Sequence, residues 1–161
     1  MQALLDDSRA SAVAEQYQDA GAYFFVGRGH QYPVALEGAL KMKEITYKHA
    51  EGFAAGELKH GPLALVTDDT PIIAVLTEGA HPDETLNSVK EAESRGAPVI
   101  GCHSDGHGEK FIDAAFEVPA LGEMEPLVAN VYMQLFAYHV ANSKGRGIDK
   151  PRNLAKSVTV E

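Results

Sequence analysis

Three short apolar runs constrain the fold of this chain more than any other feature. They read "AYFFVG" at 22–27, "PIIAVLT" at 71–77 and "PVIGCHS" at 98–104, and their apolar character is continuous rather than alternating. A strand that faces water on one side alternates apolar and polar residues, whereas a strand covered on both faces does not. We therefore expect buried strands of a parallel sheet, with "AAFEVPA" at 114–120 as a fourth and weaker strand.

Helical patterns separate these runs. They extend over 33–49, 82–95 and 126–144, and residues 4–18 predict a further helix before the first strand. Alternation of strands and helices is typical of βαβ units. The sequence therefore predicts an α/β fold, a three-layer sandwich in which helices flank a parallel β-sheet.

The length suits a single unit. A chain of 161 residues can bury one core and is short for two, so we expect one domain overall. Within it we expect a leading helix at 1–20, the main α/β unit at 21–145 and a tail at 146–161. The 45% apolar and 23% charged residues are an ordinary globular composition, which argues against a disordered chain.

The net charge argues against two classes of partner. With 14 Lys and Arg against 23 Asp and Glu, the formal charge of -9 would repel nucleic acids and anionic membranes. No apolar run approaches the roughly 20 residues that a membrane-spanning helix needs, and the first ten residues lack the features of a secretory signal. We expect a cytoplasmic protein with neither nucleic acid nor membrane as a partner.

The single cysteine, Cys102, cannot form an internal disulfide. It lies inside the third apolar run, where a buried structural thiol is a better interpretation than a nucleophile. We expect no metal site and no cofactor.

The loop "GRGHQY" at 27–32 follows the first predicted strand. Open α/β sheets bind ligands beyond the carboxyl ends of their strands, so this loop is a candidate ligand edge, with Arg28 as the candidate substrate contact. Turn geometry alone also explains Gly27 and Gly29, and both interpretations remain open at this point.

A charged stripe runs along the helix predicted at 33–49. Glu37, Lys41, Glu44 and Lys48 stand at offsets of 0, 4, 7 and 11, which places them on one helix face. One interpretation is a solvated surface with two Glu-to-Lys pairs. The other is a cleft or interface, because a solvated face is not usually bordered by apolar residues on both sides. The bordering residues are Gly38, Met42, Ile45 and His49 on one side and Leu36, Leu40 and Tyr47 on the other.

The stretch "GELKHGPLAL" at 56–65 places Glu57, Lys59 and His60 on a glycine-flanked loop directly before an apolar segment. A loop histidine is often only a hydrogen-bonded structural residue. Here the flanking glycines allow close backbone approach, and "PLALV" at 62–66 would anchor the loop in the core. His60 is therefore a candidate for a positioned imidazole.

Two longer blocks carry a resemblance to a known family. "GRGHQYPVALEGALKMKEITYKHAEGFAAGELKHGPLAL" at 27–65 and "DKPRNLAKSVTVE" at 149–161 resemble the isomerase part of the glucosamine-6-phosphate synthases, the glutamine–fructose-6-phosphate amidotransferases. More narrowly, they resemble the second of the two sugar isomerase (SIS) domains of that family. The resemblance runs from about residue 20 to the last residue.

The resemblance implies both a fold and a reaction. The fold is a flavodoxin-like parallel sheet between helices, in agreement with the pattern of strands and helices. The reaction converts fructose 6-phosphate and ammonia from glutamine to glucosamine 6-phosphate, through ring opening, imine formation at C2 and a proton shift between C1 and C2. This is an aminotransferase and ketose–aldose isomerase step of amino-sugar biosynthesis.

The resemblance also implies roles for particular residues. Glu44 matches the general base, and Lys41 and Glu37 match the residues that orient it and contact the open-chain sugar. His60 matches the ring-opening histidine, which in the family reaches the site of the neighbouring subunit and so implies a homodimer. Lys156 matches the lysine that forms a Schiff base with the ketose, and Ala155 beside it is a further expected substrate contact.

The chain also departs from the family pattern. It lacks the glutaminase domain, the first SIS domain and, after its first strand, the Ser/Thr-rich loop that holds the sugar phosphate. We therefore expect the C-terminal half of an isomerase whose partners are those two domains, with weak or no isomerase activity alone. The alternatives are a sugar-phosphate-binding regulatory module without catalysis and an inert dimerisation module.

Overall fold

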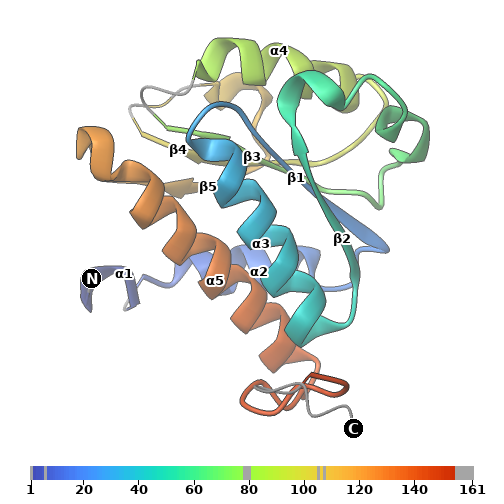
Figure 1. Cartoon of the computed structure of the whole chain (residues 1–161), viewed down its shortest axis with the longest axis vertical. Coiled ribbons are helices and arrows are strands. Elements are labelled where there is room, and N and C mark those ends of the chain that lie inside the picture. Colours follow the sequence, from blue (N-terminus) through green and yellow to red (C-terminus); the bar gives the residue numbers. More distant parts are fainter. Residues whose placement is uncertain (1, 6, 78–80, 105, 107, 155–161) are drawn as a thin grey trace, which may run out of the picture.

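A five-stranded parallel sheet forms the centre of the molecule. The computed structural model describes residues 2–5, 7–77, 81–104, 106 and 108–154 (Figure 1). Within these residues the strands are β1 Ala22–Gly27, β2 His49–Ala54, β3 Ile72–Leu76, β4 Val99–His103 and β5 Ala114–Glu117. Their order in the sheet is β2-β1-β3-β4-β5, with every neighbouring pair parallel. This is the flavodoxin-like order and confirms the expected α/β class.

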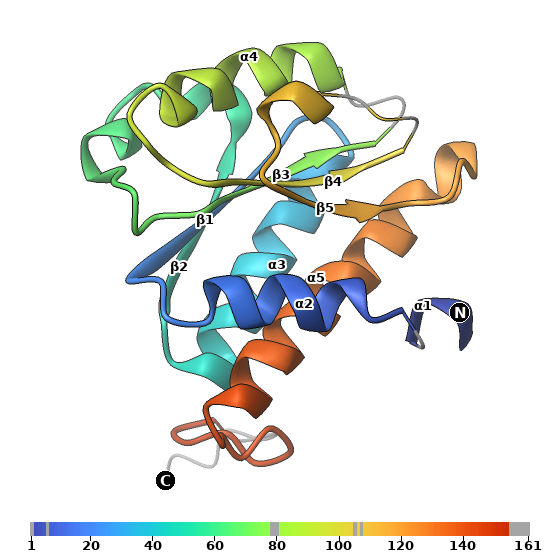
Figure 2. The same cartoon turned by 180° about the vertical axis from the view of Figure 1, so that it is seen from behind.

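Helices cover both faces of the sheet. The α-helices are α1 Gln2–Leu5, α2 Arg9–Tyr17, α3 Gln31–Thr46, α4 Pro82–Glu93 and α5 Glu125–Ser143. Short 3-10 turns lie at η1 Ala55–Glu57, η2 Pro62–Leu65, η3 Glu109–Phe111 and η4 Gly122–Met124. Helices α2, α3 and α5 pack on one face and α4 on the other, as the two opposite views show (Figures 1 and 2).

The two sheet faces bury separate clusters of side chains. Along β1, Tyr23 and Phe25 point into the cluster under α2, α3 and α5, whereas Phe24 and Val26 point into the cluster under α4. All four side chains are at most 1% exposed. The continuous apolar runs therefore reflect strands that are covered on both faces, as predicted.

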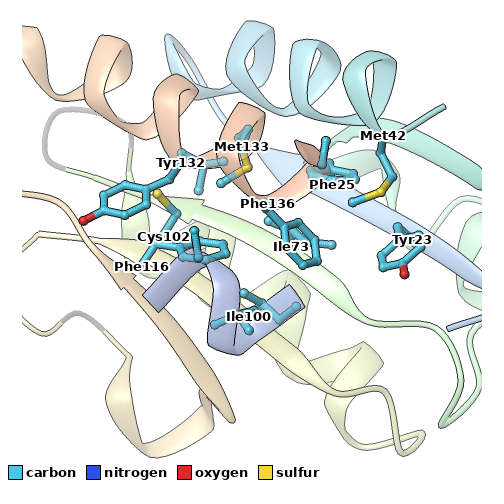
Figure 3. Close-up of a cluster of buried hydrophobic side chains, with 14 of the residues drawn as sticks. Tyr23, Phe25, Met42, Ile73, Ile100, Cys102, Phe116, Tyr132, Met133 and Phe136 are labelled. Carbon is cyan, nitrogen blue, oxygen red and sulfur yellow. The ribbon is translucent and has the colours of Figure 1, made fainter. Parts of the chain in front are cut away.

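The larger cluster is rich in aromatic rings. Phe116 of β5 stacks on Tyr132 of α5 with ring centres 5.4 Å apart, and Phe136 packs edge-on against Tyr23 at 5.9 Å. Cys102 is fully buried among them (Figure 3), and burial raises the pKa of its thiol well above the usual range. The structural interpretation of this cysteine is thereby supported, since a thiol held protonated is a poor nucleophile.

Helix α3 lies unusually close to its neighbours at one glycine. A Cβ atom built on Gly38 would stand 2.8 Å from Cδ1 of Phe25 and 3.1 Å from Cγ of Met133. Only glycine therefore fits where α3 meets β1 and α5. This contact sets how closely α3 packs on the sheet.

The end of the first long helix was predicted wrongly. The helix predicted at 33–49 ends at Thr46, because Tyr47 takes a left-handed conformation with φ 63° that stops the helix. The chain then forms β2, which the sequence did not suggest, since "HAEGFA" lacks the β-branched residues typical of strands. Pairing of all six β2 residues with β1 holds this edge strand in place.

The N-terminal helix predicted at 4–18 is two helices, α1 and α2, with Asp7 between them. The Asp7 carboxylate accepts hydrogen bonds from the backbone N–H of Arg9 at 2.9 Å and from the hydroxyl of Tyr132 at 2.7 Å. Asp7 therefore connects the start of α2 to α5.

Candidate functional site

Three of the four stripe residues form one charged cluster on α3. The ammonium Nζ of Lys41 lies 2.7 Å from Oε2 of Glu44 and 3.5 Å from Oε1 of Glu37. The three side chains are 27–34% exposed, so they are neither in the core nor free in solvent. The hydrogen bond that Lys41 donates to Glu44 raises the pKa of Lys41, which keeps the ammonium charged between the two carboxylates.

Lys48 does not belong to this cluster, and its place in the stripe was wrong. Because α3 ends at Thr46, Lys48 lies beyond the last turn, and its ammonium donates to the backbone oxygen of Ala20 at 2.8 Å. Lys48 therefore holds the loop before β1.

A hollow of about 580 Å³ adjoins the cluster at the C-terminal end of α3. Glu44 lines it, whereas Lys41 and Glu37 do not. The segment that follows α5 closes one side, next to the end of α3 (Figures 1 and 2). The lining residues are Leu40, Lys43, Glu44, Tyr47, Lys48, His49, Arg152, Asn153 and Leu154.

Tyr47 joins that segment to α3, a contact that no sequence pattern indicated. Its hydroxyl accepts a hydrogen bond from the backbone N–H of Arg152 at 2.9 Å. The guanidinium groups of Arg152 and Arg146 lie 4.3 Å and 5.2 Å from its ring centre. Lys156 and Ala155, the expected imine-forming lysine and its neighbour, lie outside the described residues.

His60 lies at the other end of the sheet from Glu44. It is exposed, six residues beyond the end of β2, and its backbone N–H donates to the carbonyl oxygen of Glu57 at 3.0 Å. Arg28 follows β1 at this same carboxyl end of the strands. A Cβ atom built on Gly56, in the loop of His60, would stand 3.4 Å from Nη2 of Arg28. One chain therefore brings Arg28 near the loop of His60 but does not bring His60 to Glu44.

The loop of His60 is anchored in the core on both sides. Of the segment expected to anchor it, 62–66, Val66 is buried in the cluster under α4 and Leu63 packs against that cluster, whereas Leu65 in the turn η2 is 63% exposed. Leu58, two residues before His60, is fully buried in the same cluster, an anchor that the sequence did not suggest. The N–H of Leu63 donates to the carbonyl of Leu58 at 3.0 Å and joins the two sides of the loop.

The loop after β1 is a tight turn without a hydroxyl cradle. A Cβ atom on Gly27 would lie 2.4 Å from the carbonyl oxygen of Gln31, so packing alone requires this glycine. Gln31 itself is buried, and its amide nitrogen donates to the hydroxyl of Thr77 at the end of β3. The sequence did not suggest this buried polar pair.

The described residues form neither a metal-binding cluster nor a membrane-spanning helix. No group of three or more His, Cys, Asp or Glu side chains in that part of the chain could hold a metal ion. No helix there is both long and apolar enough to cross a membrane.

The comparisons with known proteins agree with one another. A model of the SIS domain family matches residues 16–143. The chain is 61% identical over 162 residues to the glutamine–fructose-6-phosphate aminotransferase (isomerizing) of Halobacterium salinarum, a match that covers 100% of this chain and 27% of that protein. The chain therefore spans about a quarter of the length of the curated relatives it matches.

Solved structures show the same similarity. The C-terminal domain of glucosamine-fructose-6-phosphate aminotransferase from Francisella tularensis superposes with a TM-score of 0.83 at 40% identity, over 91% of this chain and 43% of that one. A glucosamine-6-phosphate deaminase from Thermotoga maritima superposes with a TM-score of 0.72 at 28% identity, over 96% of this chain and 46% of that one.

Proposed function

The chain belongs to the SIS domain family, and from this premise we propose that it is the C-terminal half of the isomerase unit of a glucosamine-6-phosphate synthase. The unit would convert fructose 6-phosphate and ammonia to glucosamine 6-phosphate. The contact of Lys41 with both Glu44 and Glu37 carries the proposal, because the same three residues were singled out by the resemblance.

Glu44 is the proposed general base. A proton shift between C1 and C2 needs one group that removes a proton from one carbon and returns it to the other, and a carboxylate has this capacity only when ionised. The ammonium of Lys41 donates a hydrogen bond to Oε2 of Glu44 at 2.7 Å, which holds the carboxylate group in place. The hollow beside Glu44 offers space for an open-chain sugar.

Lys41 and Glu37 are the proposed orienting residues. A lysine that contacts one carboxylate a turn before it and another a turn after it holds both against rotation, which keeps the base in one position relative to the substrate. The remaining donor capacity of the ammonium can bind a sugar hydroxyl, since an ammonium has three N–H donors.

Lys156 and His60 complete the proposed reaction. The unprotonated amine of Lys156 would add to the C2 carbonyl and release water, and ammonia would then take its place in the imine. Lys156 follows Leu154 by two residues, and Leu154 lines the hollow of Glu44. His60 would move the proton of ring opening, for which an imidazole is suited near neutral pH.

A homodimer belongs to the same proposal. His60 and Arg28 lie beyond the carboxyl ends of the strands, at the end of the sheet opposite to Glu44. They would therefore serve the same sugar as Glu44 only if they came from a neighbouring subunit. The proposed partners are a second copy of this chain and the first SIS and glutaminase domains of the same enzyme.

The proposal is tested by grafting. This chain replaces the matching segment of the Halobacterium salinarum relative, and glucosamine 6-phosphate is measured from fructose 6-phosphate and glutamine. We expect an active chimera in which Glu44→Gln loses activity by a factor of roughly 10² to 10⁴. Glu93→Gln, the same change on an exposed residue of α4, serves as the matched control and should leave the rate unchanged.

Other outcomes would contradict the proposal. A folded but inactive chimera that still binds fructose 6-phosphate would favour the regulatory module instead. An active chimera that tolerates Glu44→Gln would show that the base is another residue.

A further inference from the structure

We propose that Tyr47 is a positioning residue that holds the C-terminal segment beside Glu44. The inference rests on the proposed function, in which Lys156 of that segment forms the imine. Tyr47 is not among the expected site residues and belongs to the apolar border of the stripe.

The backbone of Tyr47 is in a conformation that its side chain disfavours. Its φ of 63° and ψ of 22° lie in the left-handed region, where a Cβ atom crowds the following carbonyl oxygen. Glycine or asparagine is the usual residue at such a helix end. A tyrosine in this place therefore needs contacts that keep it there.

The hydroxyl and the ring of Tyr47 both contact the segment that follows α5. The hydroxyl of Tyr47 accepts the N–H of Arg152, which is 105 positions away in the chain, at 2.9 Å. The Arg152 guanidinium also lies 4.3 Å from the ring centre, and that of Arg146 lies 5.2 Å away. Among the described residues, Tyr47 receives both the hydrogen bond and the cation–π contact that join 147–154 to the rest of the fold.

This attachment point is next to the proposed base. Glu44 precedes Tyr47 by three residues on α3, and both line the hollow together with Arg152. Lys156 follows Arg152 by four residues, and four residues of chain span at most about 14 Å whatever their path. The contact between Arg152 and Tyr47 therefore limits how far Lys156 can lie from a sugar bound at Glu44.

Proteolysis tests the attachment without any assay of activity. Trypsin cleaves after Arg152, while Pro151 protects the bond after Lys150, so the rate of cleavage after Arg152 can be followed by intact mass. We expect about tenfold faster cleavage in Tyr47→Asn, which loses the ring and the hydroxyl contact. Asparagine accepts the left-handed conformation, so the Tm should not fall.

Two further variants separate the role of the ring from that of the hydroxyl and provide a control. Tyr47→Phe keeps the ring against the guanidinium groups and should restore most of the protection. Tyr138→Ala removes a tyrosine that is 44% exposed on α5 and should leave the cleavage rate unchanged.

The chimera with the Halobacterium salinarum relative tests the positional role. We expect Tyr47→Asn to lower kcat and the rate of borohydride trapping of fructose 6-phosphate on Lys156 by about tenfold each. The KM should change little and Tyr47→Phe should recover most of both rates, a pattern that a general loss of stability would not give.

The possible failures are distinguishable. Equal cleavage rates in Tyr47→Asn and the unchanged chain would overturn this inference and leave the proposed function intact, as would faster cleavage with unchanged trapping. No adduct on Lys156 in the unchanged chimera would overturn the proposed function, and this inference with it.

Discussion

Within one chain, Glu44 lies near the amino ends of strands β1 and β2, whereas His60 lies beyond the carboxyl end of β2. Glu44 is two residues from the end of the helix at Thr46, where β2 begins beside the amino end of β1. His60 follows the far end of β2, whose six residues span roughly 20 Å. Under the proposed function, the two side chains would therefore act on one sugar only if they came from two copies of the chain.

Mixing two inactive variants tests this relationship. In the chimera, Glu44→Gln and His60→Ala each disable every site of their own homodimer. In a mixed dimer with His60 supplied in trans, one site carries both defects and the other carries neither, so equal mixing and subunit exchange should restore about a quarter of the original activity. No recovery after verified exchange would place both residues in the same chain's site.

Leu58 should stabilise the loop of His60 far more than Leu65 does. Leu58 is fully buried, and Leu58→Ala should lower the free energy of unfolding by about 2–5 kcal/mol. Leu65 makes the matched control, because it is 63% exposed and its loss should change the free energy by less than about 0.5 kcal/mol. Urea unfolding of both variants measures the difference, and equal effects would show that Leu58 does not anchor the loop.

The strands could be predicted from sequence where burial alone defines them. The runs at 22–27, 71–77 and 98–104 became β1, β3 and β4, because continuous apolar character follows directly from cover on both faces. Strand β2 could not be predicted in this way. Its residues are mostly half-buried, and its pairing with β1 depends on the rest of the sheet.

The candidate site was likewise predicted only in part. Helical periodicity correctly placed Glu37, Lys41 and Glu44 together, since spacing along one helix is a local property. It wrongly added Lys48, because the left-handed turn at Tyr47 carries no glycine signal. The contact between Tyr47 and Arg152 joins distant parts of the chain, which no local pattern can reveal.

Gly38→Ala should destabilise the protein although alanine favours helices. The added Cβ would meet Phe25 at 2.8 Å and Met133 at 3.1 Å, and both side chains are fully buried. Overpacking of about 1–3 kcal/mol should exceed the roughly 1 kcal/mol gained in helix propensity. Gly56→Ala is the control, since its Cβ would meet only the flexible end of Arg28 at 3.4 Å. A Tm of Gly38→Ala at or above that of the control would mean that α3 shifts freely on the sheet.

Asp7 should make part of the stability depend on pH at the acidic side. Burial disfavours its carboxylate, but the hydrogen bonds from Arg9 and Tyr132 outweigh burial and lower the pKa below the usual 3.8. A carboxyl group with a lowered pKa stabilises the fold above the unfolded value, and this contribution is lost as the pH falls through the folded value. The wild type should therefore lose this advantage only below about pH 4.

Asp7→Asn removes that contribution at every pH. At pH 7 we expect the variant to unfold with a free energy lower by about 1–2 kcal/mol, because charge-assisted hydrogen bonds to Arg9 and Tyr132 are weakened. The gap should narrow as the pH falls below about 4, because Asp7 of the wild type takes up a proton first in the unfolded state and then, at lower pH, in the folded state. Urea titrations at several pH values measure it, with Asp68→Asn, an exposed turn residue, as the control. A gap that stays constant over this range would show that Asp7 stabilises the junction of α2 and α5 by its shape alone and not by its charge.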